Sequence, residues 1–471
     1  MTTDRSFSST SISSERGARK LPPTLPGGVP VLGHALELRT RPVELLQRGR
    51  DMFGDIFSLR LPRSPVTAVM TGTAAQELFF RIPDDEVSVR EVYQLMVPIF
   101  GKGIAYDAEP AIMKEQLGFF HAALRESRLK TYVDGFIEEA EHFFGGWRDE
   151  EVVDLYEVGN QLTIFTSSRS LLGKDFREKL SKEFAELYYD LEGGLSLLAF
   201  FAPYLPTPAF RRRDRARQRM GELISRIVAE RRAKGISDHD FLQTVMEARY
   251  SDGRVVSDDE MTGLLLAIMF AGHHTSGVTF AWTGILLQQH PEFLTPVLEE
   301  QKHVLGDRND VTLDDLRAMV HLERAVKETL RMYPPLIMLM RRVLKGFDFA
   351  GYRVPEHSMI MVSPAVAHRI PEVFANPNKF DPDRFGPGRE EDKKHPMGWI
   401  AFGAGRHRCM GIVFAQLQLR AIWSHLLRNF EFELIDSKYE PDYQRMIVAP
   451  RQPCRARFRR KRPRTLVAMS A

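Results

Sequence analysis

The stretch Phe402-Gly403-Ala404-Gly405-Arg406-His407-Arg408-Cys409-Met410-Gly411 decides how the rest of the chain is interpreted. It places one cysteine among three glycines and three cationic side chains. The cations favour a thiolate, and the glycines let the backbone approach a flat ligand closely. Zinc and iron–sulfur sites need several cysteines, but the chain has only one other, Cys454. A thiolate backed by amides suits the axial ligand of a haem, and the alternative is a buried structural cysteine in a glycine turn.

The whole string resembles the haem-binding signature of the cytochrome P-450 superfamily, F-x-x-G-x-R-x-C-x-G. Arg406 or His407 stands for the family's arginine, and Ala401 replaces the usual proline before the phenylalanine. An apolar helical pattern follows at once from Ile412. The resemblance implies haem b with Cys409 as the iron ligand, supported by Phe402, Gly403, His407 and Gly411.

Length and composition favour one large domain. The chain has 471 residues, a net charge of +3 and two cysteines. The charge is too small to imply nucleic-acid binding, and the cysteine count fits a reducing compartment without a disulfide framework. We expect a disordered segment over residues 1–20, one haem domain over 21–460 and a basic tail over 461–471. Residues 1–20 contain no apolar run of the kind found in signal peptides or anchors, which predicts a soluble, cytoplasmic protein of the bacterial type, or a chain from which an anchor has been removed.

A second chemical signal interrupts a long apolar helix. Ser257-Asp258-Asp259-Glu260 is a capping box, and residues 261–288 contain no Asp, Glu, Lys or Arg, which predicts a helix buried on all sides. A membrane span is excluded because Gly272-His273-His274-Thr275-Ser276 breaks the apolar run. Thr275 can bond back to the carbonyl of Ala271 and open a polar notch suited to dioxygen and a proton.

The string Ala271-Gly272-His273-His274-Thr275-Ser276 resembles the oxygen-activation motif of the superfamily, in the form typical of sterol 14α-demethylases. Two histidines in a core helix are otherwise usually structural. The resemblance implies that Thr275 and His274 organise protons around bound dioxygen and that Glu192 completes a relay to solvent. It also implies that Phe270 and Ala271 face the substrate.

Residues 93–107, Y-Q-L-M-V-P-I-F-G-K-G-I-A-Y-D, are too broken by proline and glycine to form one regular element. They form either a cavity wall or a loop packed on the core. The segment resembles the substrate-facing stretch of the sterol 14α-demethylases, with Tyr93 toward the haem and Leu95 and Phe100 toward the sterol. Leu95 in place of phenylalanine predicts a preference for sterols with two C4 methyl groups; the alternative is that Leu95 only fills the core. Lys114 is expected to meet a haem propionate.

The remaining motifs frame the site. Glu328 and Arg331 stand one turn apart on a helix stopped by two prolines, and Arg384 follows in Phe380-Asp381-Pro382-Asp383-Arg384-Phe385. The superfamily resemblance makes these three side chains a clamp behind the cysteine. It also places Leu336, Met338 and Met446 toward substrate and Arg341 toward a propionate. Short strands are expected at 56–61, 66–70, 347–354 and 358–362, and the cationic pattern over 455–459 predicts an edge strand.

The resemblance covers roughly residues 21–460 and implies a mainly α fold, the cytochrome P-450 fold, with a smaller β-rich region. The implied reaction is three successive oxidations of a sterol 14α-methyl group that consume dioxygen and end in loss of formate. Electrons are expected from a separate ferredoxin and reductase, and azole inhibitors are expected to ligate the iron. Two alternatives stay open: a monooxygenase of the same fold acting on another lipid or terpenoid, and a haem-binding sensor without turnover.

Overall fold

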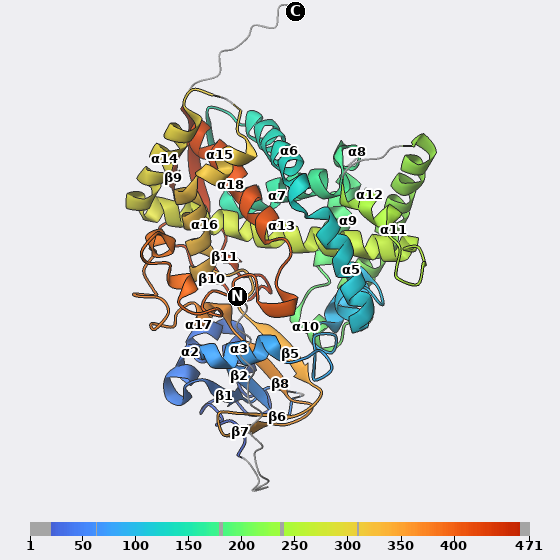
Figure 1. The fold of residues 1–471 in the computed structure, drawn as a ribbon, viewed down its shortest axis with the longest axis vertical. Coiled ribbons are helices and arrows are strands. Elements are labelled where there is room, and N and C mark those ends of the chain that lie inside the picture. Colours follow the sequence, from blue (N-terminus) through green and yellow to red (C-terminus); the bar gives the residue numbers. More distant parts are fainter. Residues whose placement is uncertain (1–19, 63, 179–181, 236–239, 309, 462–471) are drawn as a thin grey trace, which may run out of the picture.

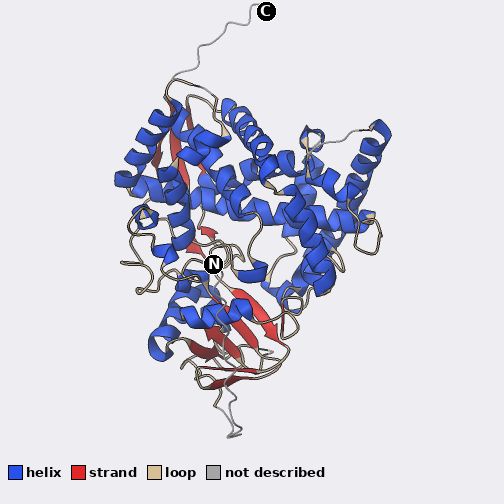
Figure 2. Cartoon of the chain, viewed as in Figure 1, coloured by secondary structure: helices blue, strands red, loops and turns tan. Residues whose placement is uncertain are grey.

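A computed structural model describes residues 20–62, 64–178, 182–235, 240–308 and 310–461. Helices make up most of the molecule, and strands gather mainly at the end that carries the N-terminal part of the chain (Figures 1 and 2). The predicted mainly α architecture with a smaller β-rich region is therefore confirmed. The segments 1–19 and 462–471 lie outside the described residues, so the predictions of a disordered N-terminal segment and a basic tail stay predictions there.

The helical part is built from amphipathic segments around one long apolar helix. Its α-helices are α4 (Val97–Phe100), α5 (Pro110–Ala123), α6 (Glu126–Gly145), α7 (Leu155–Leu172), α8 (Lys174–Glu178), α9 (Lys182–Glu192), α10 (Leu197–Phe201), α11 (Pro208–Lys234), α12 (Phe241–Glu247), α13 (Asp258–Gln289), α14 (Pro291–Leu305), α15 (Leu313–Ala318), α16 (Val320–Met332) and α18 (Ile412–Asn429). Helices α1 (Ala35–Thr40), α2 (Pro42–Phe53), α3 (Thr73–Arg81) and α17 (Pro364–Ala367) accompany the β region. Short 3₁₀ turns are η1 (Gln94–Met96), η2 (Ala105–Asp107), η3 (Pro382–Phe385), η4 (Glu391–Lys393) and η5 (Gly405–His407).

Helix α13 organises the larger core and crosses the middle of the helical part in Figure 1. It begins at the predicted capping box, where Ser257 accepts from the Glu260 N–H and the Glu260 carboxylate accepts in return. Helices α7, α11, α16 and α18 pack against it, which explains an apolar sequence without a polar face. Helix α13 is long and apolar enough to cross a membrane, but 78% of its most apolar window is buried inside the fold.

The β region centres on a five-stranded sheet in the order β1-β2-β8-β5-β3. Strands β1 (Ile56–Leu59) and β2 (Thr67–Met70) form the predicted hairpin, and β2 pairs in parallel with β8 (Met359–Val362). Strands β5 (Leu339–Val343) and β3 (Val87–Ser88) complete it, and β6 (Phe347–Phe349) pairs with β7 (Tyr352–Val354) nearby. Buried aliphatic and aromatic side chains of these strands and of α3 form a second core.

The C-terminal strand corrects one prediction. Strand β12 (Arg455–Arg460) is the middle strand of a sheet, between β4 (Glu150–Asp154) and β9 (Phe430–Leu434), and not an edge strand. Its arginines meet carboxylates on both neighbours: Arg457 lies 3.2 Å from Glu150 and 2.6 Å from Glu433. The arginines of β12 therefore form ion pairs with carboxylates on both neighbouring strands. A last two-stranded ladder joins β10 (Pro441–Asp442) to β11 (Ala449–Pro450).

The described residues begin and end just outside the predicted domain of residues 21–460. The Lys20 carbonyl accepts a hydrogen bond from the Arg353 N–H at 2.9 Å, and Lys461 Nζ donates to the Leu427 carbonyl at 2.7 Å. The predicted domain bounds stay a prediction.

Candidate functional site

The cysteine loop, residues 402–411, contains the 3₁₀ turn η5 and leads directly into α18. The Cys409 N–H donates to the Phe402 carbonyl at 2.8 Å, which folds the ten residues back on themselves. Gly403 and Gly405 have φ values of 67° and 63°, in the left-handed region that side chains rarely adopt. A β-carbon on Gly405 would also lie 2.8 Å from the Phe80 carbonyl oxygen. These two glycines are therefore required by the loop and not only by a ligand.

The sulfur of Cys409 is accessible yet closely surrounded by protein, as at the bottom of a recess. Burial raises the pKa of the thiol above its usual value, although the Gly411 N–H and Arg408 act in the opposite direction. Arg408 therefore favours the thiolate, as predicted for the cations of the loop, but burial outweighs its effect in the protein alone. Arg406 and His407 instead contact the carboxylate of Asp84, as described below.

Helix α13 has a break in its buried surface at the predicted notch. Residues before and after the notch are almost all buried, but Ala271 is exposed and Thr275 is partly exposed. The Thr275 hydroxyl donates to the Ala271 carbonyl at 2.7 Å, as predicted. An exposed alanine in the middle of a core helix means that the packing of other elements against α13 is interrupted at this point.

A carboxylate reaches this notch from the end of α9. Glu192 Oε1 lies 2.6 Å from His274 Nε2 and 3.7 Å from His273 Nδ1. Both Glu192 and His274 keep some exposed surface, whereas His273 is buried. The structure thus brings Glu192 together with His274, and Thr275 follows His274 directly in α13.

A second set of polar groups surrounds the recess of Cys409. Arg341 on β5 is buried, donates to the Phe79 carbonyl at 2.9 Å and stacks on the Phe79 ring. Burial lowers the pKa of Arg341 to about 10. Among the residues that the structure describes, no carboxylate forms an ion pair with it. A buried cation without a bound anion is the arrangement expected where a ligand carboxylate binds.

Two tyrosines that begin and end the 93–107 segment lie together. The rings of Tyr93 and Tyr106 are 4.9 Å apart, and Tyr93 Oη accepts from the Met340 N–H at 3.4 Å. Tyr106 keeps 41% of its surface exposed, yet burial, with smaller effects of Tyr93 and Cys409, raises its pKa far above the usual value. Tyr106 therefore lies close to the sulfur. It was not among the predicted site residues, although its spacing from Tyr93 in one loop was visible.

His407 and Arg406 contact a carboxylate outside the cysteine loop. His407 Nε2 lies 2.8 Å from Asp84 Oδ1, and Arg406 Nη1 lies 3.4 Å from Asp84 Oδ2. Asp84 follows α3 and carries no motif, so it could not be predicted from the sequence. The predicted role of His407 at a haem stays a prediction. Lys114 on α5 is exposed, and no hydrogen bond or ion pair of it occurs in the described part of the chain. Its predicted role at a propionate stays a prediction.

The residues predicted to face substrate fall into two groups. Leu336 and Met446 are 40% and 43% exposed, so each presents apolar surface that the described part of the chain does not cover. Phe100 and Phe270 are buried and meet edge to face at 5.8 Å, and Met338 is partly buried between two small cores. Leu95 is 4% exposed and packs with Ala199 and Phe210. Leu95 therefore packs in a small core cluster in this structure, and its predicted contact with a sterol stays a prediction.

The predicted clamp is fully buried and has a fourth member. Arg331 binds Glu328 through two contacts of 2.7 and 2.8 Å, and Arg384 Nε lies 3.0 Å from the same carboxylate. Arg384 also contacts Glu391 at 2.6 Å, a carboxylate that the sequence analysis missed. The charges of the two arginines and the two glutamates thus neutralise each other in the interior. The remaining guanidinium N–H groups donate hydrogen bonds to backbone carbonyls.

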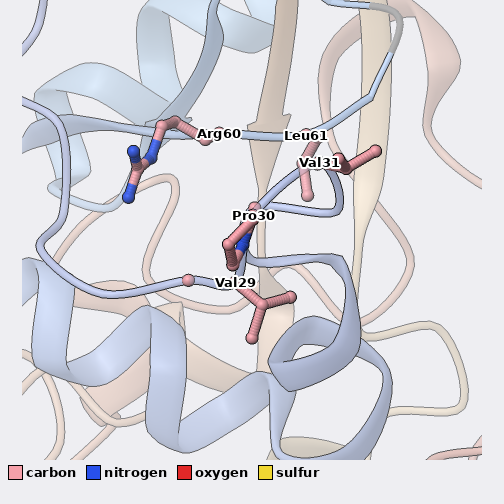
Figure 3. A pocket seen from close by; sticks show the side chains of 7 residues that line it. Val29, Pro30, Val31, Arg60 and Leu61 are labelled. Carbon is pink, nitrogen blue, oxygen red and sulfur yellow. The ribbon is translucent and has the colours of Figure 1, made fainter.

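A surface hollow of about 310 Å³ lies elsewhere, between the N-terminal loop and the end of β1. Figure 3 shows Val29, Pro30 and Val31 on the loop, with Arg60 and Leu61 opposite. The Arg60 side chain is exposed and donates to the Gly27 carbonyl. The hollow gathers no acid, base, nucleophile or metal ligand, so we do not assign it a function.

Comparisons of the sequence with known proteins point to one protein family. The model of the cytochrome P450 family matches residues 22–458. A sterol 14-demethylase of Arabidopsis thaliana is 40% identical over 455 residues, which is 95% of this chain and 93% of that protein. A sterol 14alpha-demethylase of Mycolicibacterium vanbaalenii is 40% identical over 93% of this chain and 98% of its own length. A lanosterol 14-alpha demethylase of Bos taurus is 35% identical over 94% and 88%.

One solved structure has the same fold at low sequence identity. Retinoic acid-bound cyanobacterial CYP120A1 superposes with a TM-score of 0.81 at 22% identity, over 94% of this chain and 100% of that one. At this identity the match supports the fold alone, and it agrees with the helical body and β region described above.

Proposed function

Because this chain belongs to the cytochrome P450 family, we propose that it is a haem-thiolate monooxygenase that removes the 14α-methyl group of a lanosterol-like sterol precursor. The observation that carries the proposal is the exposed notch of α13, where the Thr275 hydroxyl bonds the Ala271 carbonyl and Glu192 of α9 meets His274 at 2.6 Å. Relatives of 35–40% identity over nearly the whole chain, each described as a sterol or lanosterol demethylase, support the sterol as substrate.

The residues present fit a haem b. Cys409 supplies the one accessible thiol, and the buried, unpaired Arg341 with Tyr93 and Tyr106 supplies partners for the carboxylates of the group. His407 would add a further donor if it turned from Asp84, and Phe402, Gly403 and Gly411 shape the loop around the sulfur. When bound, the haem supplies activation of dioxygen, and the thiolate ligand favours cleavage of the O–O bond.

The chain's own part in the reaction is to deliver protons and exclude water. The hydroxyl of Thr275 lies at the exposed notch of α13, and His274 precedes Thr275 in the sequence. Glu192 is close enough to His274 to exchange a proton with it and is partly exposed, so it connects the notch to solvent. The aromatic pair Phe100 and Phe270 keeps the surroundings of the notch dry.

The substrate would lie against the apolar side chains that remain exposed. Leu336, Met446 and Ala271 offer accessible apolar surface, and Phe270, Phe100 and Met338 stand behind it. An apolar wall with few polar groups suits a sterol, whose only strong polar group is its hydroxyl. Azoles, which combine an apolar body with a nitrogen ligand for iron, are expected to bind the same place.

We also propose the context in which the protein works. Residues 21–460 act as one haem domain, and electrons come from a separate ferredoxin and reductase, since the described helices and strands are taken up by the P450 fold. The burial of α13, the described helix long and apolar enough to cross a membrane, is consistent with a soluble protein of the cytoplasm.

The test is turnover of a 14α-methyl sterol by the haem-loaded protein with surrogate ferredoxin and reductase, read by mass spectrometry. We expect the 14-demethylated sterol and formate in equal amounts. Turnover of another lipid or terpenoid, but of no 14α-methyl sterol, would replace the substrate and keep the enzyme class. A haem-loaded protein that consumes no electrons with any sterol would favour the sensor alternative.

A further inference from the structure

His273, the neighbour of the proposed relay, has no part in that relay, yet its surroundings are unusual. The residue is 5% exposed, and its Nε2 lies 3.0 Å from the backbone carbonyl oxygen of Asn160. A carbonyl oxygen can only accept, so Nε2 carries the ring proton and Nδ1 presents a lone pair. Nδ1 is buried and has no hydrogen-bond partner in the described part of the chain.

The polar atom opposite this lone pair is itself an acceptor. Glu192 Oε1 lies 3.7 Å from His273 Nδ1. This oxygen atom is also buried, and it lacks a well-aligned hydrogen bond although it lies 2.6 Å from His274 Nε2. Two buried lone pairs thus face each other without a proton between them.

We propose that Glu192, His273 and His274 form a binding site for a zinc-type divalent cation. Their three ligand atoms lie within 4.8 Å of one another. Tetrahedral zinc with bonds of about 2.0–2.2 Å sets its ligands roughly 3.3 Å apart, and the separations of 2.6 and 3.7 Å from Glu192 fall on either side of this value. Two imidazoles and one carboxylate suit Zn²⁺ and neighbouring first-row ions and disfavour Mg²⁺ and Ca²⁺.

The second shell of the site is already in place. A metal-binding histidine usually donates its other ring N–H to a carbonyl or carboxylate, as His273 does to Asn160. The ring of Tyr188 packs edge-on against His273 at 5.3 Å and limits its rotation. The partial exposure of Glu192 and His274 gives an ion access from solvent and leaves room for water as the fourth ligand.

The site has a regulatory consequence, which rests on the proposed function. A cation held by Glu192 and His274 withdraws both groups from proton transfer. Zinc should therefore slow sterol demethylation, and it should do so without displacing haem or sterol. Binding of the cation does not itself depend on turnover, so the two claims can be tested separately.

The first experiment is titration of the chelator-treated, haem-loaded protein with Zn²⁺ in a calorimeter. We expect one equivalent to bind with micromolar or tighter affinity, and His273→Gln to weaken binding by at least about tenfold. Glutamine keeps an amide N–H for the Asn160 carbonyl but lacks the Nδ1 lone pair. His303→Gln on α14 is the matched control for exposed histidines and should leave the affinity unchanged.

X-ray absorption at the zinc edge provides a second measurement on the unmodified protein. We expect two imidazole ligands and one carboxylate. Binding that survives His273→Gln, a lower affinity in His303→Gln, or a spectrum without two imidazoles would overturn the site. In turnover, zinc should inhibit the unmodified protein but not His273→Gln. If neither protein demethylates a sterol in zinc-free buffer, the proposed function fails, while the binding data still decide the zinc site.

Discussion

The backbone N–H of Ile400 donates to Nε2 of His368 at 2.9 Å, and this bond ties the start of the cysteine loop to the buried clamp. The other ring nitrogen, Nδ1, lies 3.0 Å from the carbonyl oxygen of Arg331 and must carry the proton, because Nε2 accepts. Arg331 in turn donates to the His368 carbonyl at 2.8 Å. The position of Cys409 is therefore linked to Glu328 through one buried imidazole.

His368 should make stability depend on pH. Burial and the charges of Arg331 and Arg369 lower its pKa from 6.5 to about 3 in the folded protein. Between these values the unfolded chain binds a proton that the folded one does not, so stability is complete above about pH 6.5 and falls as the pH falls. The slope is about 1.4 kcal/mol per pH unit for one such group.

The measurement is chemical denaturation of the haem-loaded protein between pH 4 and pH 7. His368→Gln should be less stable at pH 7 but should show a shallower fall toward pH 4. His425, which is also buried and has a pKa lowered to about 4, remains in both proteins and provides the common background. An unchanged slope would mean that His368 is not the titrating group.

Removal of the clamp carboxylate should prevent haem incorporation. Glu328→Ala leaves Arg331 and Arg384 without their shared partner in the interior, and a broken buried ion pair costs about 3–5 kcal/mol. We expect little haem per protein in absorbance measurements and a lower denaturation midpoint. Glu372→Ala removes a carboxylate that is 74% exposed and pairs with Arg50, so it should change neither. A stable, fully haem-loaded Glu328→Ala protein would refute the clamp.

Replacement of the sulfur ligand should change the spectrum of the bound haem. Cys409→Ser should abolish the red-shifted band of the reduced carbon monoxide complex that is diagnostic of thiolate ligation. Cys454→Ser is the control: that thiol is buried, donates to Asp154 Oδ1 at 3.2 Å and has a pKa raised by burial. The ligand assignment is wrong if the band persists in the first variant or is lost in the second.

The sequence predicted those parts of the fold that are specified locally. The capping box at Ser257, the apolar run of α13 and the bond from Thr275 to Ala271 depend on residues a few positions apart, so pattern and propensity suffice. The prolines after Met332 ended α16 where expected. The clamp needed the family resemblance as well, because Arg384 lies more than fifty residues beyond Glu328 in the chain.

The features that were missed depend on partners far away in the sequence. Strand β4 has the acidic sequence Glu150-Glu151-Val152-Val153-Asp154, which does not favour a strand by itself and forms one beside the arginines of β12. Asp84 and Glu391 matter only because the fold brings them to His407 and Arg384. The opposing effect of burial on the Cys409 thiol has the same origin, since burial cannot be read from neighbouring charges.

Thr275 should control the coupling of electron consumption to product formation. Thr275→Ala removes the hydroxyl from the notch, and we expect demethylation to fall by about 100-fold, the lower end of the contribution of a positioned acid–base group. Peroxide should rise while sterol binding persists. Thr279→Ala is a matched control, because Thr279 bonds the Thr275 carbonyl at 2.7 Å in the same manner but is buried. Equal coupling in both variants would mean that Thr275 only packs.

The last prediction concerns Leu95 and the choice of sterol. The sequence suggested that leucine here leaves space for a second C4 methyl group, and that Leu95→Phe would favour sterols with one. The structure instead buries Leu95 against Ala199 and Phe210. A phenylalanine would overfill this cluster, so we expect a loss of stability of about 1–3 kcal/mol.

Relative turnover of lanosterol and obtusifoliol by the unmodified and Leu95→Phe proteins decides between the two explanations. An added or missing methyl group in an apolar pocket is worth only about 1–3 kcal/mol, or roughly 10- to 200-fold, so a real contact would be measurable. From the packing we expect the ratio to stay unchanged while the thermal midpoint falls. A tenfold shift toward obtusifoliol would show that Leu95 reaches the substrate, which would require the cluster of Leu95, Ala199 and Phe210 to open when the sterol binds.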